Sequence, residues 1–254
     1  MDGTPPIVVE RLAPATREAY LAFFDHERGP AFSDNAEWAR CYCQFYRTSR
    51  ALDWKTLTGD QNRVAAGASI ACGEAEGYLA RTGTETIGWL HAAPRHKLPH
   101  AFERLGVEPP PIEVPPHDAA VIVCFVIAPA WRRRGVAAAL LDGALADLAV
   151  RGLAVVDAFP FKSGDSTAPA DHYHGPASLF ASRGFSTIAE TADLTVMRKH
   201  LVAGAGALTS PRRRERHRPR DACASRRGPR SRRSSKIRAR RTATRGHGSG
   251  RPAP

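Results

Sequence analysis

The sequence predicts an α/β fold in which helices cover both faces of a mixed, mostly antiparallel sheet. Two observations carry this prediction. First, the apolar run Ala119–Ile127 precedes the most regular amphipathic helix of the chain, Gly135–Arg151, which in turn precedes a second apolar run, Leu153–Phe159. A strand, a helix and a strand in this order form a right-handed crossover between parallel strands. Second, the strand-like segments on either side read as antiparallel, including a closing hairpin made of Phe185–Ala189 and Ala192–Arg198.

The other elements follow from local patterns. In the N-terminal part we expect a strand, three helices and two more strands, in this order: Ile7–Arg11, Ala15–Glu27, Asn35–Arg47, Gln61–Glu74, Gly77–Arg81 and Thr86–Ala93. Apolar residues recur near helical spacing from Val64 to Ala71, which supports the third helix. The run 119–127 is rich in β-branched residues, as a strand buried on both faces should be. Gly152 ends the crossover helix, and a short helix, Ala177–Arg183, precedes the hairpin.

Charge is divided unevenly along the chain. Residues 1–200 hold 20 Lys and Arg against 23 Asp and Glu, whereas residues 201–254 hold 17 against 2. The second stretch has four large aliphatic residues and no aromatic residue, so it cannot bury enough surface to offset its conformational entropy. We therefore expect a folded domain over residues 1–201 and a basic, Arg-rich, disordered tail over residues 202–254. The tail is either an incidental extension or a segment that contacts nucleic acid nonspecifically through its charge.

Several other classes of protein are disfavoured. The longest apolar stretch, Ala119 to Ala130, is shorter than the roughly 20 helical residues that span a bilayer. The chain opens without a basic and apolar signal segment. Its five cysteines are odd in number and mostly scattered, which disfavours a disulfide framework, and we expect the protein in the reducing cytoplasm. The sequence contains no Gly-x4-Gly-Lys-Ser/Thr loop, and Gly204-x-Gly206 follows no predicted strand. Neither an NTPase phosphate loop nor a dinucleotide fingerprint is therefore expected.

The turn between the first apolar run and the crossover helix carries the chemistry. Residues 124–137, CFVIAPAWRRRGVA, end a buried strand and begin a helix whose first backbone N–H groups have no intrahelical partner. Those groups and the positive end of the helix dipole suit a pyrophosphate. Gly135 and Ala137 leave room for phosphate oxygens, and three consecutive arginines add positive charge. A solvated basic turn without a ligand is the alternative interpretation.

This turn resembles the acetyl-CoA motif of the GNAT acetyltransferase superfamily, Gln/Arg-x-x-Gly-x-Gly/Ala, with Arg132, Gly135 and Ala137 at the matching positions. Further matches are the strand end Ile127-Ala128-Pro129, the late turn Arg183-Gly184-Phe185 and the segment Trp38-x-x-Cys41-x-Cys43 of a bacterial branch. The likeness covers about residues 7–201. It implies a GNAT-like fold, acetyl-CoA as cosubstrate, direct acetyl transfer to an amine of a small molecule or peptide, and no metal.

The resemblance also implies how acetyl-CoA is held. Pantetheine would pair with the backbone of a segment of the first parallel strand, in a gap where the two parallel strands splay apart. The Ile127 amide would polarise the thioester carbonyl. Backbone N–H groups at the start of the crossover helix would hold the pyrophosphate. The expected cofactor-binding residues are Phe125, Val126, Ile127, Arg132, Arg133, Arg134, Gly135, Val136, Ala137 and Ala138.

A base and an acid are expected from three other residues. Asp157, inside the second apolar run, is the favoured base because an apolar setting suits a carboxylate that must take up a proton. His91 is a weaker candidate, and a structural role is the alternative for both residues. The late helix has Phe180 where many relatives have a tyrosine, so Tyr173 in the preceding loop is the candidate acid. The alternative for Tyr173 is packing on the sheet edge.

Cys41 and Cys43 flank Tyr42 after Trp38. Two sulfurs without a second pair make a poor zinc site. Three interpretations stay open: core packing, which is favoured, a cysteine nucleophile, and a segment Trp38–Tyr46 that packs over the acceptor mouth, with its cysteines and aromatic residues setting specificity. Two alternatives to an N-acetyltransferase also stay open for the whole chain. One is an acetyl-CoA-binding module without catalysis, which Phe180 motivates. The other is a nucleic-acid-associated protein that acts through its basic tail.

Overall fold

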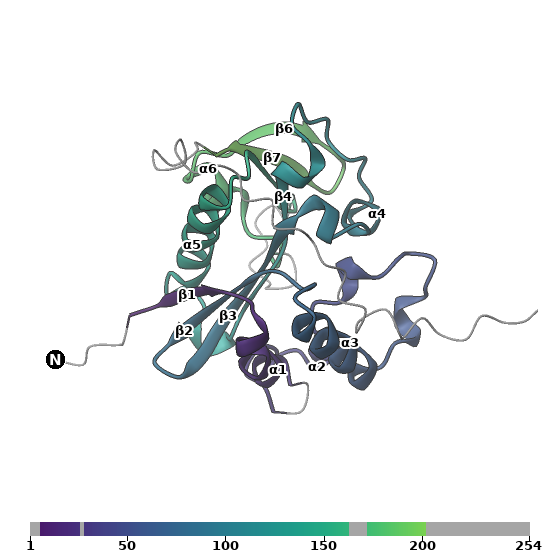
Figure 1. The fold of residues 1–254 in the computed structure, drawn as a ribbon, viewed down its shortest axis with the longest axis vertical. Coiled ribbons are helices and arrows are strands. Elements are labelled where there is room, and N and C mark those ends of the chain that lie inside the picture. Colours follow the sequence, from purple (N-terminus) through teal and green to yellow (C-terminus); the bar gives the residue numbers. More distant parts are fainter. Residues whose placement is uncertain (1–5, 26–27, 163–171, 202–254) are drawn as a thin grey trace, which may run out of the picture. The chain divides into compact units, whose positions relative to one another are not determined.

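The computed structural model describes residues 6–25, 28–162 and 172–201, and seven strands in these ranges form one sheet (Figure 1). The strands are β1 (Val8–Arg11), β2 (Tyr78–Thr82), β3 (Glu85–Pro94), β4 (Ala119–Ile127), β5 (Val155–Ala158), β6 (Ser186–Glu190) and β7 (Thr195–His200). Their order across the sheet is β1-β2-β3-β4-β5-β7-β6. Among these strands, β4 and β5 are parallel, and the other neighbours are antiparallel. The predicted mixed sheet is therefore confirmed.

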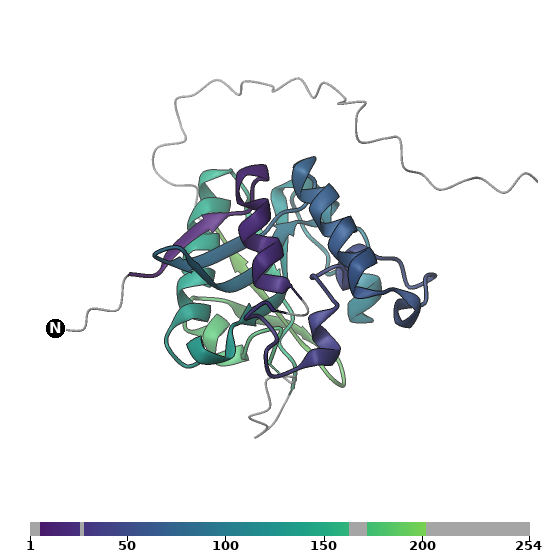
Figure 2. The ribbon, with the colours of Figure 1, turned by 90° about the horizontal axis from the view of Figure 1, so that it is seen from below.

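Helices cover both faces of the sheet. The crossover helix α5 (Val136–Val150) packs on one face against β1 to β4, while α1 (Arg17–Phe24) and α3 (Gly59–Ala71) lie side by side on the other (Figure 2). Three shorter helices are α2 (Ala36–Ala39), α4 (Ala101–Leu105) and α6 (Ala177–Ala181). Each face of the sheet has its own apolar core. None of the helices in the described ranges combines the length and the apolar character needed to cross a membrane.

The start of α5 lies over the sheet where β4 ends and β3 begins. The predicted apolar stripe of α5 is buried, and Gly88 of β3 lets the helix approach the sheet closely. A Cβ on Gly88 would lie 2.9 Å from Val136 Cγ1 and 3.1 Å from Ile127 Cδ1, which is closer than side chains pack. The absence of a side chain at Gly88 therefore allows the first turn of α5 to pack beside the last residue of β4.

The strand β4 extends beyond its parallel neighbour. Pairing with β5 ends at Ile122, whereas β4 continues to Ile127. In this extension the Phe125 N–H donates to the Tyr173 carbonyl at 2.6 Å, and the Ala128 N–H donates to the Ile87 carbonyl of β3 at 3.0 Å. Alternate residues of a strand direct their backbone groups to opposite edges. The Ile127 amide therefore faces the same edge of β4 as the Phe125 amide. At this point β5 has ended, and the edge borders a gap in the sheet.

The prediction of one helix over Asn35–Arg47 is wrong. The helix α2 ends at Ala39, because Tyr42 and Cys43 adopt φ angles of 44° and 50°, which an α-helix cannot contain. Contacts from distant elements hold this turn. The Tyr20 hydroxyl of α1 donates to the Tyr42 carbonyl at 2.8 Å, and the Trp89 indole N–H of β3 donates to the Cys43 sulfur at 3.2 Å. Tertiary contacts thus override the local helical preference.

Candidate active site

The N-terminus of α5 has the features expected of an anion site. Gly135 caps the helix with φ 81°, and no other atom lies within 4 Å of the position that a Cβ would take. The first-turn N–H groups of Val136, Ala137 and Ala138 have no acceptor within the helix by its geometry. The first turn carries no acidic side chain. A phosphate placed here would meet backbone donors and no like charge.

The three arginines of the turn have different roles. The Arg132 guanidinium pairs with the Asp34 carboxylate, and its Nε donates to the Ile127 carbonyl at 3.2 Å. This hydrogen-bonded pair lowers the pKa of Asp34. Arg133 and Arg134 are exposed, with the Arg134 guanidinium 5.5 Å from the centre of the Trp131 ring. Arg132 therefore ties the turn to the protein, while the other two present their charge to solvent.

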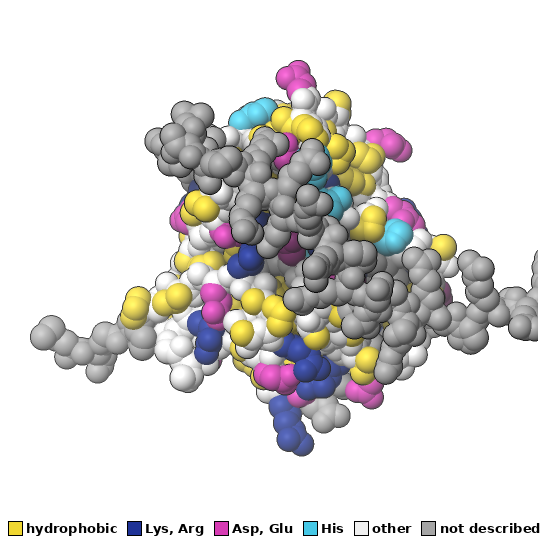
Figure 3. All heavy atoms as spheres, viewed as in Figure 1, with side chains coloured by type: hydrophobic (Ala, Val, Ile, Leu, Met, Phe, Trp, Pro, Cys, Tyr) yellow, Lys and Arg dark blue, Asp and Glu magenta, His cyan; other side chains and the backbone are white. Residues whose placement is uncertain are grey.

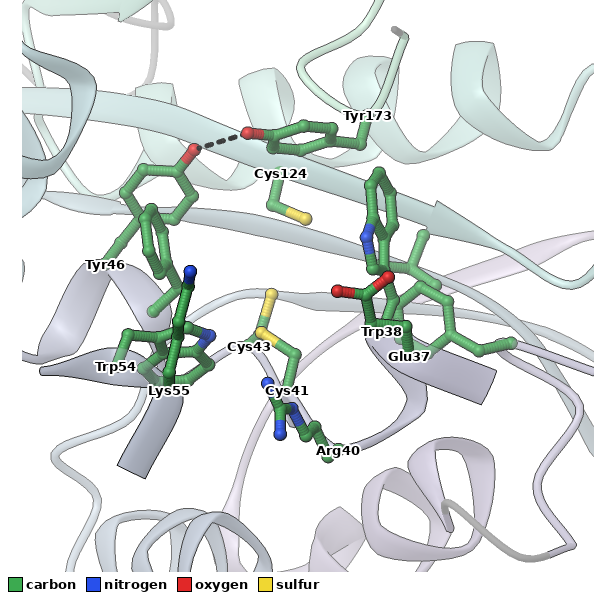
Figure 4. Close-up of a pocket in the computed structure, with 13 residues that line it drawn as sticks. Glu37, Trp38, Arg40, Cys41, Cys43, Tyr46, Trp54, Lys55, Cys124 and Tyr173 are labelled. Atoms are coloured by element: carbon green, nitrogen blue, oxygen red, sulfur yellow. Dashed lines mark hydrogen bonds between the residues drawn. The ribbon is translucent and has the colours of Figure 1, made fainter. Parts of the chain in front are cut away.

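A pocket of about 570 Å³ opens on the face of β4 opposite α5. Aromatic rings and sulfur atoms make up most of its wall, and three charged side chains reach it (Figure 4). The lining residues are Phe32, Glu37, Trp38, Arg40, Cys41, Cys43, Phe45, Tyr46, Trp54, Lys55, Cys124, Val126 and Tyr173. Cys124 and Val126 belong to β4, so the strand that extends beyond β5 also forms the pocket floor.

Three free cysteines meet in this pocket, Cys41, Cys43 and Cys124. Burial raises the pKa of Cys41 to about 12 and holds the pKa of Cys43 well above its ordinary value. Both thiols are therefore protonated at neutral pH, and a protonated thiol is a poor nucleophile. Among the described His, Cys, Asp and Glu residues, no group of three has an arrangement that could hold a metal ion. Cys41 and Cys43 thus form part of the pocket wall.

A hydrogen-bonded network leads from the pocket into the core. The hydroxyls of Tyr173 and Tyr46 lie 3.4 Å apart (Figure 4), and the Tyr46 hydroxyl also bonds to Nε2 of His174. Nδ1 of His174 lies 2.8 Å from the Phe159 carbonyl, which can only accept. Nδ1 of His174 therefore carries the hydrogen, and Nε2 accepts a hydrogen bond from the Tyr46 hydroxyl.

The electrostatic setting fixes the protonation states of this network. Burial lowers the pKa of His174 to about 3, so its ring is neutral near pH 7. Burial raises the pKa of Tyr173 to about 12, so its hydroxyl keeps its proton. Because the Tyr46 hydroxyl donates its hydrogen to His174, its oxygen can only accept a hydrogen bond from Tyr173. The long Tyr46–Tyr173 contact leaves the Tyr173 hydroxyl able to turn toward the pocket.

Asp157 is not among the residues that line the pocket. Its carboxylate is fully buried in β5 and accepts hydrogen bonds from the guanidinium groups of Arg95 and Arg198, the latter at 2.7 and 3.1 Å. Arg95 and Arg198 also donate to the carbonyls of Pro110 and Pro111. These contacts give Asp157 a structural role, and its role as a base stays a prediction. His91 is also buried away from the pocket lining, and burial lowers its pKa to about 3.

The structure therefore groups some of the predicted residues and separates others. Tyr173 bonds through its carbonyl to Phe125, which brings the candidate acid to the edge of the candidate cosubstrate strand. Sequence reasoning gave no role to Glu37 or His174, and it included Tyr46 only as the end of the segment Trp38–Tyr46. His174 directly follows Tyr173, and Glu37 directly precedes Trp38, so each is adjacent to a residue that the sequence analysis had named. No local pattern marks Tyr46, whose role depends on a partner 128 residues away.

The sequence was compared with protein-family models and curated proteins, and the fold was compared with solved structures. The model of the acetyltransferase (GNAT) family matches residues 37–170. No curated protein matches the chain. A similar solved structure is the ribosomal-protein-S18-alanine N-acetyltransferase of Escherichia coli, with 14% identity, 79% of this chain and 98% of that chain covered, and a TM-score of 0.42. Another is a GCN5-related N-acetyltransferase from Kribbella flavida, with 18% identity, 77% and 98% covered, and a TM-score of 0.46.

Proposed function

Because this chain belongs to the acetyltransferase (GNAT) family, we propose that it is an N-acetyltransferase acting on the primary amine of a small molecule or peptide. Family membership makes acetyl-CoA its cosubstrate. The amine acceptor is the proposed part, and one observation supports it above the others. The aromatic pocket lies against β4, the same strand whose edge beyond β5 carries the Phe125 and Ile127 amides. An acceptor in the pocket and a thioester at that edge would be neighbours.

The residues of the chain fit acetyl-CoA. We assign pantetheine to the edge of β4 beyond its pairing with β5, which the N–H groups of Phe125 and Ile127 face. There it would take the place of the Tyr173 carbonyl that now accepts from the Phe125 N–H. Val126 directs its backbone to β3 and its side chain to the pocket, so it contributes shape to the site. The backbone N–H groups from Arg133 to Ala138 are assigned to the pyrophosphate, with charge added by exposed Arg133 and Arg134. Arg132 would hold the turn in place through Asp34.

Acetyl-CoA supplies an acetyl thioester. The protein must polarise the thioester carbonyl, and the attacking amine must be neutral. The Ile127 amide is assigned to the carbonyl oxygen, where negative charge grows as the C–N bond forms. Neutralising a lysine-like amine of pKa about 10.4 at pH 7 costs roughly 4.6 kcal/mol, but an α-amine of pKa about 7.7 costs only about 1 kcal/mol. Asp157 remains the base proposed from sequence. Its two arginine partners favour an acceptor that needs little help from a base.

Tyr173 is assigned to the sulfur that leaves as the C–S bond breaks. A thiol has a pKa of about 8.5, whereas burial raises the pKa of Tyr173 to about 12. Handing over a complete proton would therefore cost about 5 kcal/mol. A hydrogen bond from the Tyr173 hydroxyl to the thiolate avoids this cost. The proton that finally reaches the thiolate comes from the amine nitrogen, directly or through water.

The test is an assay of thiol release from acetyl-CoA with a panel of amines, in which the acetylated product is also identified. Tyr173→Phe is expected to lower kcat about tenfold, the effect of losing one hydrogen bond, with no change in acetyl-CoA affinity. Tyr78→Phe is the control, since the Tyr78 hydroxyl donates to Asp147 of α5 and Tyr78 does not line the pocket. A loss in Tyr173→Phe of more than a thousandfold would instead indicate complete proton transfer.

A second candidate function is an acetyl-CoA-binding module without catalysis. It is favoured by Phe180, which is fully buried against Phe125 and Phe185 and cannot donate a proton. Acetyl-CoA binding without thiol release for every amine in the panel would support this candidate and contradict the proposed enzyme.

A further inference from the structure

Charged side chains at the pocket narrow the identity of the acceptor. Resting on the proposed function, we infer that the acceptor is a small zwitterion of the amino-acid class, with an ammonium group, a carboxylate and an apolar or aromatic body. Three features of the pocket carry this inference: its walls, its two opposite charges, and the position of those charges relative to β4.

The walls suit an apolar body of limited size. Trp38 packs edge-on against Tyr173 with ring centres 5.3 Å apart, and Phe45 packs edge-on against Trp54 at 5.4 Å. These paired rings support one another and leave apolar faces and edges toward the pocket. The volume of about 570 Å³ lies within the range of sites for small molecules, about 300–1,000 Å³. Protonated thiols between the rings add polarizable, uncharged surface.

Opposite charges stand on two sides of the pocket. Figure 4 shows the Glu37 carboxylate on the side of Trp38 and the Lys55 ammonium on the side of Trp54, with the sulfur atoms between them. Within the part of the chain that the structure describes, neither side chain forms an ion pair. Each is therefore available to a ligand. Arg40, below Cys41 in the same view, adds a second positive charge to the wall.

The arrangement of the charges matches the chemistry at β4. Glu37 is next to Trp38, which contacts Tyr173, and the Tyr173 carbonyl accepts the Phe125 amide of β4. An ammonium held by Glu37 would therefore lie on the side of the pocket that borders the thioester strand. The carboxylate of the same molecule would point across the sulfur atoms to Lys55. A simple amine would use only half of this arrangement, and an acid without an amine would have nothing to acetylate.

The experiment compares amino acids with their decarboxylated counterparts. Phenylalanine, tryptophan, leucine and methionine are tested against the amines that lack only the carboxylate, by thiol release and by direct binding to the protein saturated with CoA. We expect the amino acids to have a kcat/KM at least tenfold higher, as loss of one charged hydrogen bond costs about 10- to 100-fold. Lys55→Met should reduce this preference to less than threefold, because it weakens only the zwitterions.

Two more variants and two controls sharpen the result. Glu37→Gln should weaken amino acids and simple amines alike, about tenfold or more, because both carry the ammonium. Lys55→Glu should reverse the preference in favour of simple amines. Lys97→Met and Glu113→Gln, which remove charges of the same kind outside the pocket lining, should change neither.

Failure of this inference is distinguishable from failure of the proposed function. If simple amines are acetylated as well as amino acids, or if Lys55→Met leaves the preference unchanged, the zwitterion assignment is overturned while the enzyme stands. If amino acids bind in a Lys55-dependent way but no thiol is released, the assignment stands and the enzyme does not. If acetyl-CoA binds but no amino acid binds or reacts, the assignment is overturned.

Discussion

The buried carboxylate of Asp157 sits between two guanidinium groups, Arg95 on one side and Arg198 on the other. Asp157→Asn removes the negative charge and leaves the buried Arg95 and the partly buried Arg198 facing a neutral amide. We expect a loss of about 3–5 kcal/mol in the free energy of unfolding, which urea denaturation would measure. Glu113→Gln, at an exposed position, is the control with the same chemical change.

Kinetics of the same variant test the role of Asp157 as a base. A base role predicts that Asp157→Asn loses about 10²–10⁴ in kcat/KM at neutral pH and recovers at high pH, where the amine loses its proton unaided. A loss that does not change with pH would leave only the structural role that its contacts support.

His91 makes stability depend on pH. Its ring is buried against Trp89, its Nδ1 has no hydrogen-bond partner among the described residues, and burial lowers its pKa from 6.5 to about 3. Below pH 6.5 the unfolded chain therefore binds a proton that the native protein does not. Stability is unaffected by this group above pH 6.5 and falls as the pH drops toward 3.

Replacing this ring with one that does not titrate measures the effect. Between pH 7 and pH 4.5, His91→Leu should lose about 2.5 kcal/mol less of unfolding free energy than the parent protein, by urea denaturation at both values. His174, whose pKa is also lowered to about 3, preserves a similar acid sensitivity in the variant. An identical pH dependence in the two proteins would contradict the assignment.

At the scale of elements, two glycines with left-handed backbones flank α5, Gly135 directly before the helix and Gly152 two residues after it. Gly135 has φ 81° and Gly152 has φ 82°, and both point into open space. Alanine at either position is expected to cost about 1–2 kcal/mol of stability, since a Cβ disfavours this conformation. Only Gly135→Ala should also weaken acetyl-CoA binding, because its methyl group would face the assigned phosphate site. Calorimetric titration of both variants checks this, and equal affinities would remove the phosphate from this turn.

Periodic elements were predictable from sequence, whereas the walls of the pocket were not. The helix α5 and the strand β4 form because their own apolar side chains are buried, and the spacing of those side chains is visible in the sequence. The turn at Tyr42 and Cys43 depends on donors from α1 and β3, and no local pattern shows them. The strand end and helix start that we assign to the acetyl donor were therefore predictable from the sequence. The charges and hydroxyls that meet in the pocket come from separate segments and required the fold.

At the scale of the whole molecule, charge separates the described domain from the remaining C-terminal residues. Figure 3 shows acidic and basic side chains interspersed on one face, in keeping with the 20 Lys and Arg and 23 Asp and Glu of residues 1–200. The predicted tail, residues 202–254, lies outside the described residues. The Leu201 N–H donates to the Ala154 carbonyl at 2.8 Å, so the domain includes this residue, and the boundary after it stays a prediction.

A chain that ends at Leu201 tests this proposed boundary. We expect it to keep the melting temperature and the acetyl-CoA affinity of the full chain. Any DNA binding by the full chain should fall steeply with added salt and vanish on truncation, because it would depend on phosphate neutralisation. A truncated chain that unfolds would contradict the boundary, and one that still binds DNA would place that activity in the domain.

The hydrogen bond from the Phe125 amide to the Tyr173 carbonyl links the affinities of the two substrates. Pantetheine that pairs with Phe125 must take the place of this carbonyl, and Tyr173 is also a wall of the acceptor pocket. Binding at one site then alters the other, and the factor by which the donor changes acceptor affinity equals the factor in the reverse direction. We expect an ordered kinetic scheme in which acetyl-CoA adds first and sets the shape that the amine encounters.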